Sequence, residues 1–393
     1  MNKIKKKSCE VCDHPELVEV LNLGNHPLCD DLVKFGEDRE CEEYPIIINF
    51  CNNCYTAHQD CQVSKQKLFT SDYHYRARMT GSVLTGMKDL VESCEKKFGN
   101  LSGKKVLDVG CNDGSLLGFF KEKGCITFGI DPTDAIKDSE HQGIKAFFDE
   151  TSALEILQKF GNPDIITFTN VFAHIENLKE LINSLLRLVD LTKTIIVIEN
   201  HYLGTVLKTN QFDTYYHEHP RTYSYESFKH ISKSLKLKLQ DVQFVSRYGG
   251  NIRVFMSNIK AQNKSFSTPP DESNFLNDFK EANIHIQEWM KSQSKIISEH
   301  VNKFGKISAK AFPGRAAILI KLLSLDENHI SAVYEIKGSI KVGHYVPGTR
   351  IPIYPEKDLY SSENNNQPIL NLAWHIPNEV RKNLEKINSK EKF

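Results

Sequence analysis

The stretch "KKVLDVGCNDGSLLGFFKEKG", residues 104–124, decides the fold class of this chain of 393 residues. A short apolar run at residues 106–109 predicts a strand, a turn with two glycines follows, and a helix is expected to begin near Ser115. The next apolar run, "CITFGID", predicts a second strand that ends at Asp131. Two strands joined by a helix predict an α/β fold with a parallel sheet, in which ligands bind at the carboxyl ends of the strands.

The turn after the first strand has the chemistry of a nucleotide-type site. It reads D-x-G-x-x-D-G, with Asp108, Gly110, Asp113 and Gly114 at the named positions. Glycines allow the backbone to approach a ligand closely, and Asp131 is placed to accept hydrogen bonds from both hydroxyls of a ribose. No lysine follows the glycines as in a P-loop, so a triphosphate is disfavoured. By itself the turn suits any nucleotide-binding domain.

Composition limits the partners. Lysine plus arginine and aspartate plus glutamate number 50 each, which argues against nucleic acid as the main partner. No apolar run reaches membrane-spanning length, and "MNKIKKKSCE" lacks the apolar segment of a secretion signal. We therefore expect a cytoplasmic protein without a membrane partner. The length predicts two or three domains.

The cysteines predict a metal site. Cys9 and Cys12 form "CEVC", and Cys51 and Cys54 form "CNNC". Each two-residue gap lets a tight turn aim both sulfurs inward, so two such pairs can supply the four thiolates of a tetrahedral zinc site. A site closed by four sulfurs is structural and not catalytic. The other interpretation is ordinary buried thiols, which the repeated spacing makes less favourable.

The glycine turn, Asp131, and the later stretches "DIITFTNVFAHIENL" (164–178) and "TIIVIEN" (194–200) resemble class I methyltransferases that use S-adenosylmethionine. The two later stretches are expected to be the fourth and fifth strands of a Rossmann-like sheet. The resemblance implies cofactor contacts from Asp108, Gly110, Asn112, Gly114, Asp131 and Asn170.

Further motifs resemble one family. "CxxC…CxxC", "SDYHYRARMTGS" (71–82), "YHEH" (216–219), "YGGNIRVF" (248–255), "VGHYVPGTRIPI" (342–353) and "NLAWHIPNEV" (371–380) are similar to the zinc-containing C-methyltransferases of nucleotide-linked deoxysugar biosynthesis. The resemblance implies a zinc module at residues 1–75, an S-adenosylmethionine-binding Rossmann-like domain at 76–262 and a C-terminal α/β domain at 263–393. It also implies a nucleotide-linked keto-deoxysugar substrate, methylated at C3 next to a C4 ketone.

The same resemblance points to His219 as the base that removes a proton from this carbon. Tyr216 would donate a hydrogen bond to the ketone oxygen, and Glu218 would orient an imidazole or hold a sugar hydroxyl. His174 after the fourth strand and Tyr75 would face the same pocket. His174 and Tyr75 each have a structural alternative. His174 could be a hydrogen-bonded residue in the wall of the site, and Tyr75 could only pack between domains. His217, which alternates with Glu218, is expected to face solvent.

The sequence leaves two other functions to consider, and it differs from the family pattern in one segment. An O-methyltransferase acting on a sugar or glycan precursor needs only a base near a hydroxyl, and "YHEH" also suits that. A non-enzymatic zinc protein would be expected to have a degraded "DVGCNDG", which is intact here. In "AFPGRAAILIK" (311–321) this chain departs from the family pattern, with one glycine and an added Arg315 that could pair with a phosphate.

Overall fold

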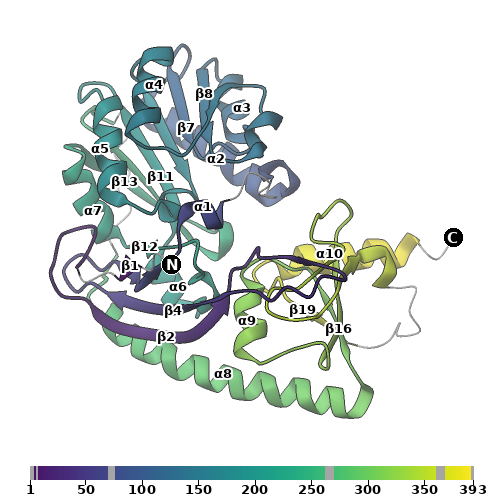
Figure 1. The fold of residues 1–393 in the computed structure, drawn as a ribbon. Helices are drawn as coiled ribbons and strands as arrows, with labels where there is room; N and C mark the ends of the chain where they lie inside the picture. Colours follow the sequence, from purple (N-terminus) through teal and green to yellow (C-terminus); the bar gives the residue numbers. More distant parts are fainter. Residues whose placement is uncertain (1–3, 6–7, 70–75, 262–269, 360–367, 391–393) are drawn as a thin grey trace. The chain divides into compact units, whose positions relative to one another are not determined.

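The structure is a computed structural model that describes residues 4–5, 8–69, 76–261, 270–359 and 368–390 (Figure 1). The chain forms two compact units. Unit 1 comprises Met1–Val20, Ile48–Thr209 and Glu218–Asp278, and unit 2 comprises Leu21–Ile47, Asn210–His217 and Phe279–Phe393. The predicted limits of three domains, at residues 75 and 262, adjoin or fall among residues outside the described ones, and they stay predictions.

Unit 1 is built around a seven-stranded sheet in the order β13-β14-β11-β10-β7-β8-β9. The five strands from β11 to β9 run parallel, whereas β14 is antiparallel to both β11 and β13. The strands are β7 Lys105–Val109, β8 Ile126–Asp131, β9 Gln142–Lys145, β10 Ile165–Thr169, β11 Ile195–His201, β13 Lys238–Val245 and β14 Asn251–Ser257. The first, second, fourth and fifth strands predicted from the sequence are all present, and the Rossmann-like α/β fold is confirmed.

Helices lie on both faces of this sheet (Figure 1). They are α2 Gly81–Phe98, α3 Ser115–Glu122, α4 Glu150–Phe160, α5 Leu178–Leu188, α6 Leu203–Lys208 and α7 Tyr225–Ser234. The central strands are almost wholly buried because helices cover both faces, which is why β10 and β11 read as continuous apolar runs. One core cluster joins α2 and α3 to the sheet through residues such as Leu90, Leu117 and Val197.

A smaller sheet, in the order β12-β5-β4-β2, supports the zinc-binding region. It consists of β2 Val18–Pro27, β4 Glu43–Phe50, β5 Ala57–Gln59 and β12 Arg221–Thr222. Within unit 1, β12 pairs antiparallel with β5 and sets Arg221 opposite His58. The chain segment just after "YHEH" is thereby joined to the segment that follows the second cysteine pair.

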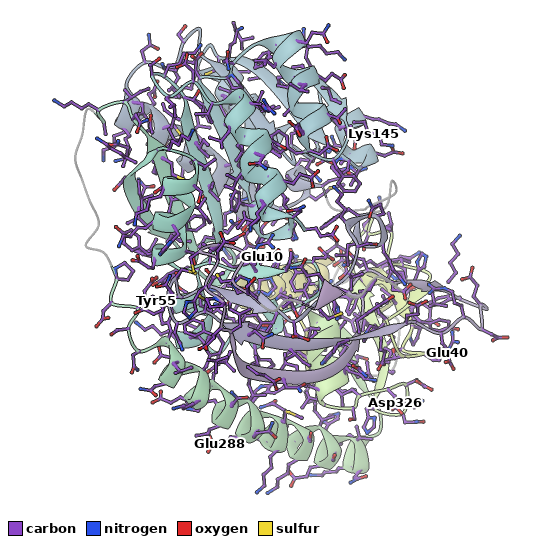
Figure 2. All side chains as sticks on the ribbon, turned by 60° about the vertical axis from the view of Figure 1, so that its left-hand side comes forward. Glu10, Glu40, Tyr55, Lys145, Glu288 and Asp326 are labelled. Carbon is purple, nitrogen blue, oxygen red and sulfur yellow. The ribbon has the colours of Figure 1, made fainter. Side chains whose placement is uncertain are left out.

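Unit 2 contains a second, parallel sheet in the order β18-β16-β15-β19. Its elements are α8 Phe275–Phe304, which begins in unit 1, β15 Ile307–Lys310, α9 Ala316–Leu322, β16 Ile330–Glu335, β18 Ile353–Pro355, β19 Ile369–Asn371 and α10 Pro377–Lys390. Glu288 projects outward from α8 (Figure 2), whose exposed positions also include the apolar residues Ile284 and Ile296. The α/β arrangement that the resemblance implies for the C-terminal part of the chain is confirmed.

In the part of the chain that the structure describes, no helix combines the length and the apolar character needed to cross a membrane.

Candidate functional site

Four cysteines meet in unit 1. One sulfur from each of Cys9, Cys12, Cys51 and Cys54 lies within 4.8 Å of the others. The sulfurs of Cys9 and Cys54 are 3.4 Å apart, and those of Cys12 and Cys51 are 3.6 Å apart. Four thiolates around one zinc ion, each at about 2.3 Å, stand about 3.75 Å from one another, so this donor set fits a tetrahedral zinc site. The prediction from the two C-x-x-C pairs is confirmed, and the other cysteines in the described residues lie outside the cluster.

An ion network links the zinc cluster to Arg221, two residues after "YHEH". His58 Nε2 lies 3.3 Å from Cys9 Sγ, and its Nδ1 lies 3.9 Å from the Glu10 carboxylate. Glu10 accepts a hydrogen bond of 2.6 Å from Arg221 Nη1, and the Arg221 side chain is fully buried. Figure 2 labels Glu10. Arg221 also donates to the carbonyl oxygens of Ile175 and Glu176, which follow His174 directly. The zinc module thus fixes the loop after the fourth strand.

The glycine turn makes a close cradle at the end of β7. Gly110 and Gly114 have φ angles of +72° and +78°. A Cβ atom on Gly110 would stand 2.5 Å from Val171, and one on Gly114 would stand 2.3 Å from Ser139. These positions require glycine both for the backbone conformation and for the space.

Asp131 lies at the predicted place, at the end of β8 and almost fully buried. Its Oδ2 accepts a hydrogen bond of 2.9 Å from Asn112 N, and its Oδ1 accepts from Thr133 N and Thr133 Oγ1. The carboxylate is therefore held rigidly at the carboxyl end of the strand. Asn112 has φ +51°, which turns the backbone sharply after Gly110.

Asp108 is buried beneath this turn. Its Oδ1 accepts a hydrogen bond of 2.7 Å from Thr167 Oγ1 on the neighbouring strand. Burial raises the pKa of Asp108 to about 7, which the bond from Thr167 opposes. A buried carboxyl of this kind favours a bound cation, which would keep it ionised.

The segment before α2 is attached to the glycine turn. Asn112 Oδ1 accepts a hydrogen bond from Ala77 N, and Asp113 Oδ2 accepts one from Arg78 N, each of 3.0 Å. Asn112 therefore contributes its backbone to the glycine turn, while its side chain holds the segment that leads into α2. Tyr75, two residues before Ala77, lies outside the described residues.

Buried polar atoms without hydrogen-bond partners gather at the ends of β10 and β11. They are Thr169 Oγ1, Asn170 Nδ2 and both amide atoms of Asn200. Asn170 has φ +53° and donates its backbone N–H to Glu199 O at 2.7 Å. Buried polar groups are ordinarily paired, so this edge of the sheet fits a polar ligand such as S-adenosylmethionine.

Three histidines lie together at the same edge. The ring centroid of His219 is 4.7 Å from that of His174 and 5.4 Å from that of His201. The Tyr248 ring lies 6.0 Å from His201. His174 Nδ1 donates a hydrogen bond of 2.7 Å to Glu218 O, and burial lowers its pKa to about 4. Of the expected catalytic residues, the structure thus brings His174, Glu218 and His219 together.

The other half of "YHEH" belongs to unit 2. Tyr216 is half-buried, while His217 is only 3% exposed, so the expectation that His217 faces solvent is wrong. Its Nε2 donates to Tyr44 O at 3.1 Å, and burial lowers its pKa to about 4. His217 is a packed, neutral histidine that ties this segment to β4.

Arg315 is also buried in unit 2. Its Nε donates to Asp213 Oδ2 at 2.8 Å, its Nη2 donates to Asp213 Oδ1, and Trp374 Nε1 donates to Asp213 Oδ2 at 2.8 Å. The guanidinium lies over the Trp374 ring at 5.1 Å. The Arg315 guanidinium, which the sequence suggested for a phosphate, is already paired with a carboxylate of the chain.

Sequence reasoning missed His201, Arg247 and Tyr248. His201 directly follows "TIIVIEN" at the carboxyl end of a predicted parallel strand, which was a usable signal. Tyr248 opens the quoted motif "YGGNIRVF", to which no role was assigned. Arg247 had no signal, because only the antiparallel pairing of β14 with β11 brings it to this edge.

Comparisons with known proteins cover nearly the whole chain. Three family models match in order: "Putative zinc binding domain" at residues 9–69, "Methyltransferase domain" at 75–241 and "C-methyltransferase C-terminal domain" at 246–393. The C-methyltransferase NovU of Streptomyces niveus is 26% identical over 389 residues, which span 95% of this chain and 90% of that protein.

Two solved structures each resemble less than half of the chain. Magnesium protoporphyrin IX methyltransferase of Synechocystis PCC 6803, with bound S-adenosylmethionine, is 13% identical and covers 44% of this chain and 79% of its own, with a TM-score of 0.33. A methyltransferase of Archaeoglobus fulgidus is 19% identical and covers 43% of this chain and 93% of its own, with a TM-score of 0.34. Likeness at this level supports no inference about substrate.

Proposed function

We propose that this chain, a member of the zinc-containing, S-adenosylmethionine-dependent C-methyltransferases, methylates a nucleotide-linked keto-deoxysugar at C3 next to a C4 ketone. Membership, the class of enzyme and the two cofactors rest on the matches to three family models and to a C-methyltransferase over nearly the whole chain. The sugar, the position of methylation and the roles of the residues are the proposal.

The observation that carries the proposal is the buried histidine cluster at the carboxyl ends of β10 and β11. His219 is 5% exposed and lies against two other imidazoles. Methylating a carbon requires a carbanion-like nucleophile, which a base creates by removing a proton next to a ketone. Imidazole has a pKa near working pH and suits this task.

The neighbours of His219 favour its action as a base. Because burial lowers the pKa of His174 to about 4, that ring is neutral at pH 7 and adds no positive charge beside His219. The bond from His174 Nδ1 to Glu218 O fixes the His174 ring against the backbone next to His219. His174 therefore adds no positive charge that would oppose an imidazolium at His219.

In the proposed reaction, an imidazole nitrogen of His219 takes the α-proton, and the electrons of the C–H bond form an enolate. Tyr216 donates a hydrogen bond to the enolate oxygen, and Glu218 holds a sugar hydroxyl. S-adenosylmethionine supplies an electrophilic methyl group on its sulfonium sulfur. The enolate carbon takes this methyl group as the carbon–sulfur bond breaks, and His219 then loses its proton to solvent. A role for Tyr75 in the reaction stays a prediction.

The residues around the glycine turn are proposed to bind S-adenosylmethionine. Asp131 accepts hydrogen bonds from the ribose, Gly110 and Gly114 allow close approach, and Asn170 and Asp108 face the rest of the molecule. Asn112 shapes the turn through its backbone. Zinc crosslinks the two cysteine knuckles and takes no part in the chemistry.

The test is product analysis with methyl-labelled S-adenosylmethionine and a panel of nucleotide-linked 4-keto-deoxysugars. We expect one of them to gain the labelled methyl group on carbon, located by NMR. A matched pair of variants, His219→Asn and His285→Asn, separates the proposed base from an exposed histidine on α8. The first should transfer little methyl and the second should behave as wild type.

Other products would assign other functions. A labelled methyl group on oxygen would establish an O-methyltransferase. Failure of every keto-sugar in the panel, with S-adenosylmethionine bound normally, would refute the substrate class.

A further inference from the structure

Arg247 is a buried arginine with unused donors. Its side chain is 6% exposed, and its hydrogen bond from Nη1 to Glu199 Oε1 is long, at 3.3 Å. The guanidinium lies over the Tyr248 ring at 5.2 Å, and Nε is buried without a hydrogen-bond partner. Gly86 of α2 leaves room for it, since a Cβ there would stand 2.7 Å from Arg247 Cδ. A guanidinium carries five donors, so burial with so few partners is costly unless a ligand completes them.

Glu199 does not fully compensate this charge, because a second arginine shares it. Arg253 Nε donates to Glu199 Oε2 at 2.8 Å, the shorter of the two contacts. Arg253 is further satisfied by Asp89 Oδ2 at 2.8 Å and by Gln243 Oε1 at 3.1 Å. Arg253 is therefore a structural residue, whereas Arg247 retains the capacity to bind an anion.

The sheet register places Glu199, which accepts a hydrogen bond from Arg247, on the same face of the sheet as Asp108. Thr167 pairs with Asp108, and two residues further along, Thr169 pairs with Glu199. Side chains two apart point to the same face of a strand, so Thr169 and Glu199 continue the face that carries Asp108 toward the carboxyl ends. The positive charge of Arg247 is close enough to lower the pKa of Asp108, against the larger effect of burial. Opposite charges thus face one edge of the sheet.

The direction of the cofactor follows from the strand order. A ribose held at Asp131 sits at the end of β8, with β9 on the edge side and β7, β10 and β11 on the other. The unpartnered Thr169 Oγ1 is at the end of β10, on that other side. The methionine half of S-adenosylmethionine, which extends from the ribose, therefore points toward Asp108 and Arg247.

We propose that Arg247 binds the α-carboxylate of S-adenosylmethionine while Asp108 faces its α-ammonium group. The amino-acid half of the cofactor is a zwitterion, and a buried zwitterion needs one matched charge for each of its own. Arg247 is suited to a carboxylate because its planar fork can donate two parallel hydrogen bonds. The inference depends on the cofactor and not on the identity of the methyl acceptor.

The test is calorimetric binding of two ligands that differ in the amino-acid half. S-adenosylhomocysteine keeps the carboxylate and the ammonium, whereas 5′-methylthioadenosine lacks both. Arg247→Gln should weaken S-adenosylhomocysteine by about 10- to 150-fold, the loss expected for charge-assisted hydrogen bonds, and leave 5′-methylthioadenosine unchanged. The matched control is Arg187→Gln, which removes an exposed arginine paired with Glu150. It should change neither affinity.

Two outcomes overturn the proposal. Unchanged binding of S-adenosylhomocysteine to Arg247→Gln places the carboxylate elsewhere. Equal losses for the two ligands show that Arg247 only supports the fold of the site. Arg247→Lys is the conservative control for misfolding. Because it keeps the positive charge, it should lose less affinity for S-adenosylhomocysteine than Arg247→Gln does. Asp131→Ala shows the pattern expected when the ribose contact is lost: it should weaken the binding of both ligands, whereas Arg247→Gln should weaken only S-adenosylhomocysteine.

Discussion

The buried ion pair between Glu10 and Arg221 gives the sharpest prediction about stability. Arg221 Nη1 lies 2.6 Å from Glu10 Oε2, with side-chain exposures of 0% and 13%. Removing one partner of a buried pair typically costs about 3–5 kcal/mol, because the other charge stays buried. Arg221 keeps hydrogen bonds to Ile175 O and Tyr223 OH, so we place Glu10→Gln near the lower end, at about 3 kcal/mol.

The assay is urea unfolding of the zinc-loaded protein, followed by circular dichroism and by zinc release to a chromogenic chelator. Glu16→Gln, at an exposed glutamate of the same region, is the matched control and should stay within about 0.5 kcal/mol of wild type. Amide hydrogen exchange should quicken at Ile175 and Glu176, because Arg221 holds that segment. If Glu10→Gln unfolds like the control and the amide hydrogen exchange is unchanged, the ion pair does not link the zinc module to the segment after β10 that carries His174.

Three further outcomes follow from the site. Cys54→Ser should release zinc and destabilise unit 1, which elemental analysis and thermal unfolding will show; full zinc content in the variant would contradict the four-cysteine site. Asp131→Ala should weaken S-adenosylmethionine by tenfold or more in calorimetry, and an unchanged affinity would move the ribose contact elsewhere. His174 and His217 have pKa values lowered to about 4 in the folded chain, so the unfolded chain takes up protons first on acidification. The contribution of each histidine to the free energy of unfolding is complete above pH 6.5 and falls by about 3 kcal/mol between about pH 6.5 and 4. His217→Asn should therefore make the free energy of unfolding depend less steeply on pH. An identical pH profile of stability in this variant would show that His217 does not cause the loss.

The sequence was sufficient for features set by local spacing. The strand at residues 106–109 and the helix from Ser115 follow from apolar periodicity and a glycine turn, and β7 and α3 occupy these places. The zinc ligands follow from two equal gaps between cysteines. Asp131 follows from its position at the end of an apolar run.

Features set by pairing between distant segments could not be predicted in this way. Arg221 reaches Glu10 across 211 positions, and Arg315 reaches Asp213 across 102. His217 appeared solvent-facing because its segment is polar, yet Tyr44 O accepts its hydrogen bond and the ring is buried. Single-sequence patterns report which face of an element is apolar, but they do not report which distant partner satisfies a buried polar group.

The most direct test of the central claim follows the α-proton of a nucleotide-linked 4-keto-deoxysugar by NMR in deuterated water, with S-adenosylhomocysteine bound in place of the methyl donor. Wild-type protein should exchange this proton for deuterium, and His219→Asn should bind both ligands but exchange little. His285→Asn should exchange at the wild-type rate. If His219→Asn exchanges the proton as fast as wild type, His219 is not the base; if wild type exchanges none, the methyl group is not transferred to an enolate carbon.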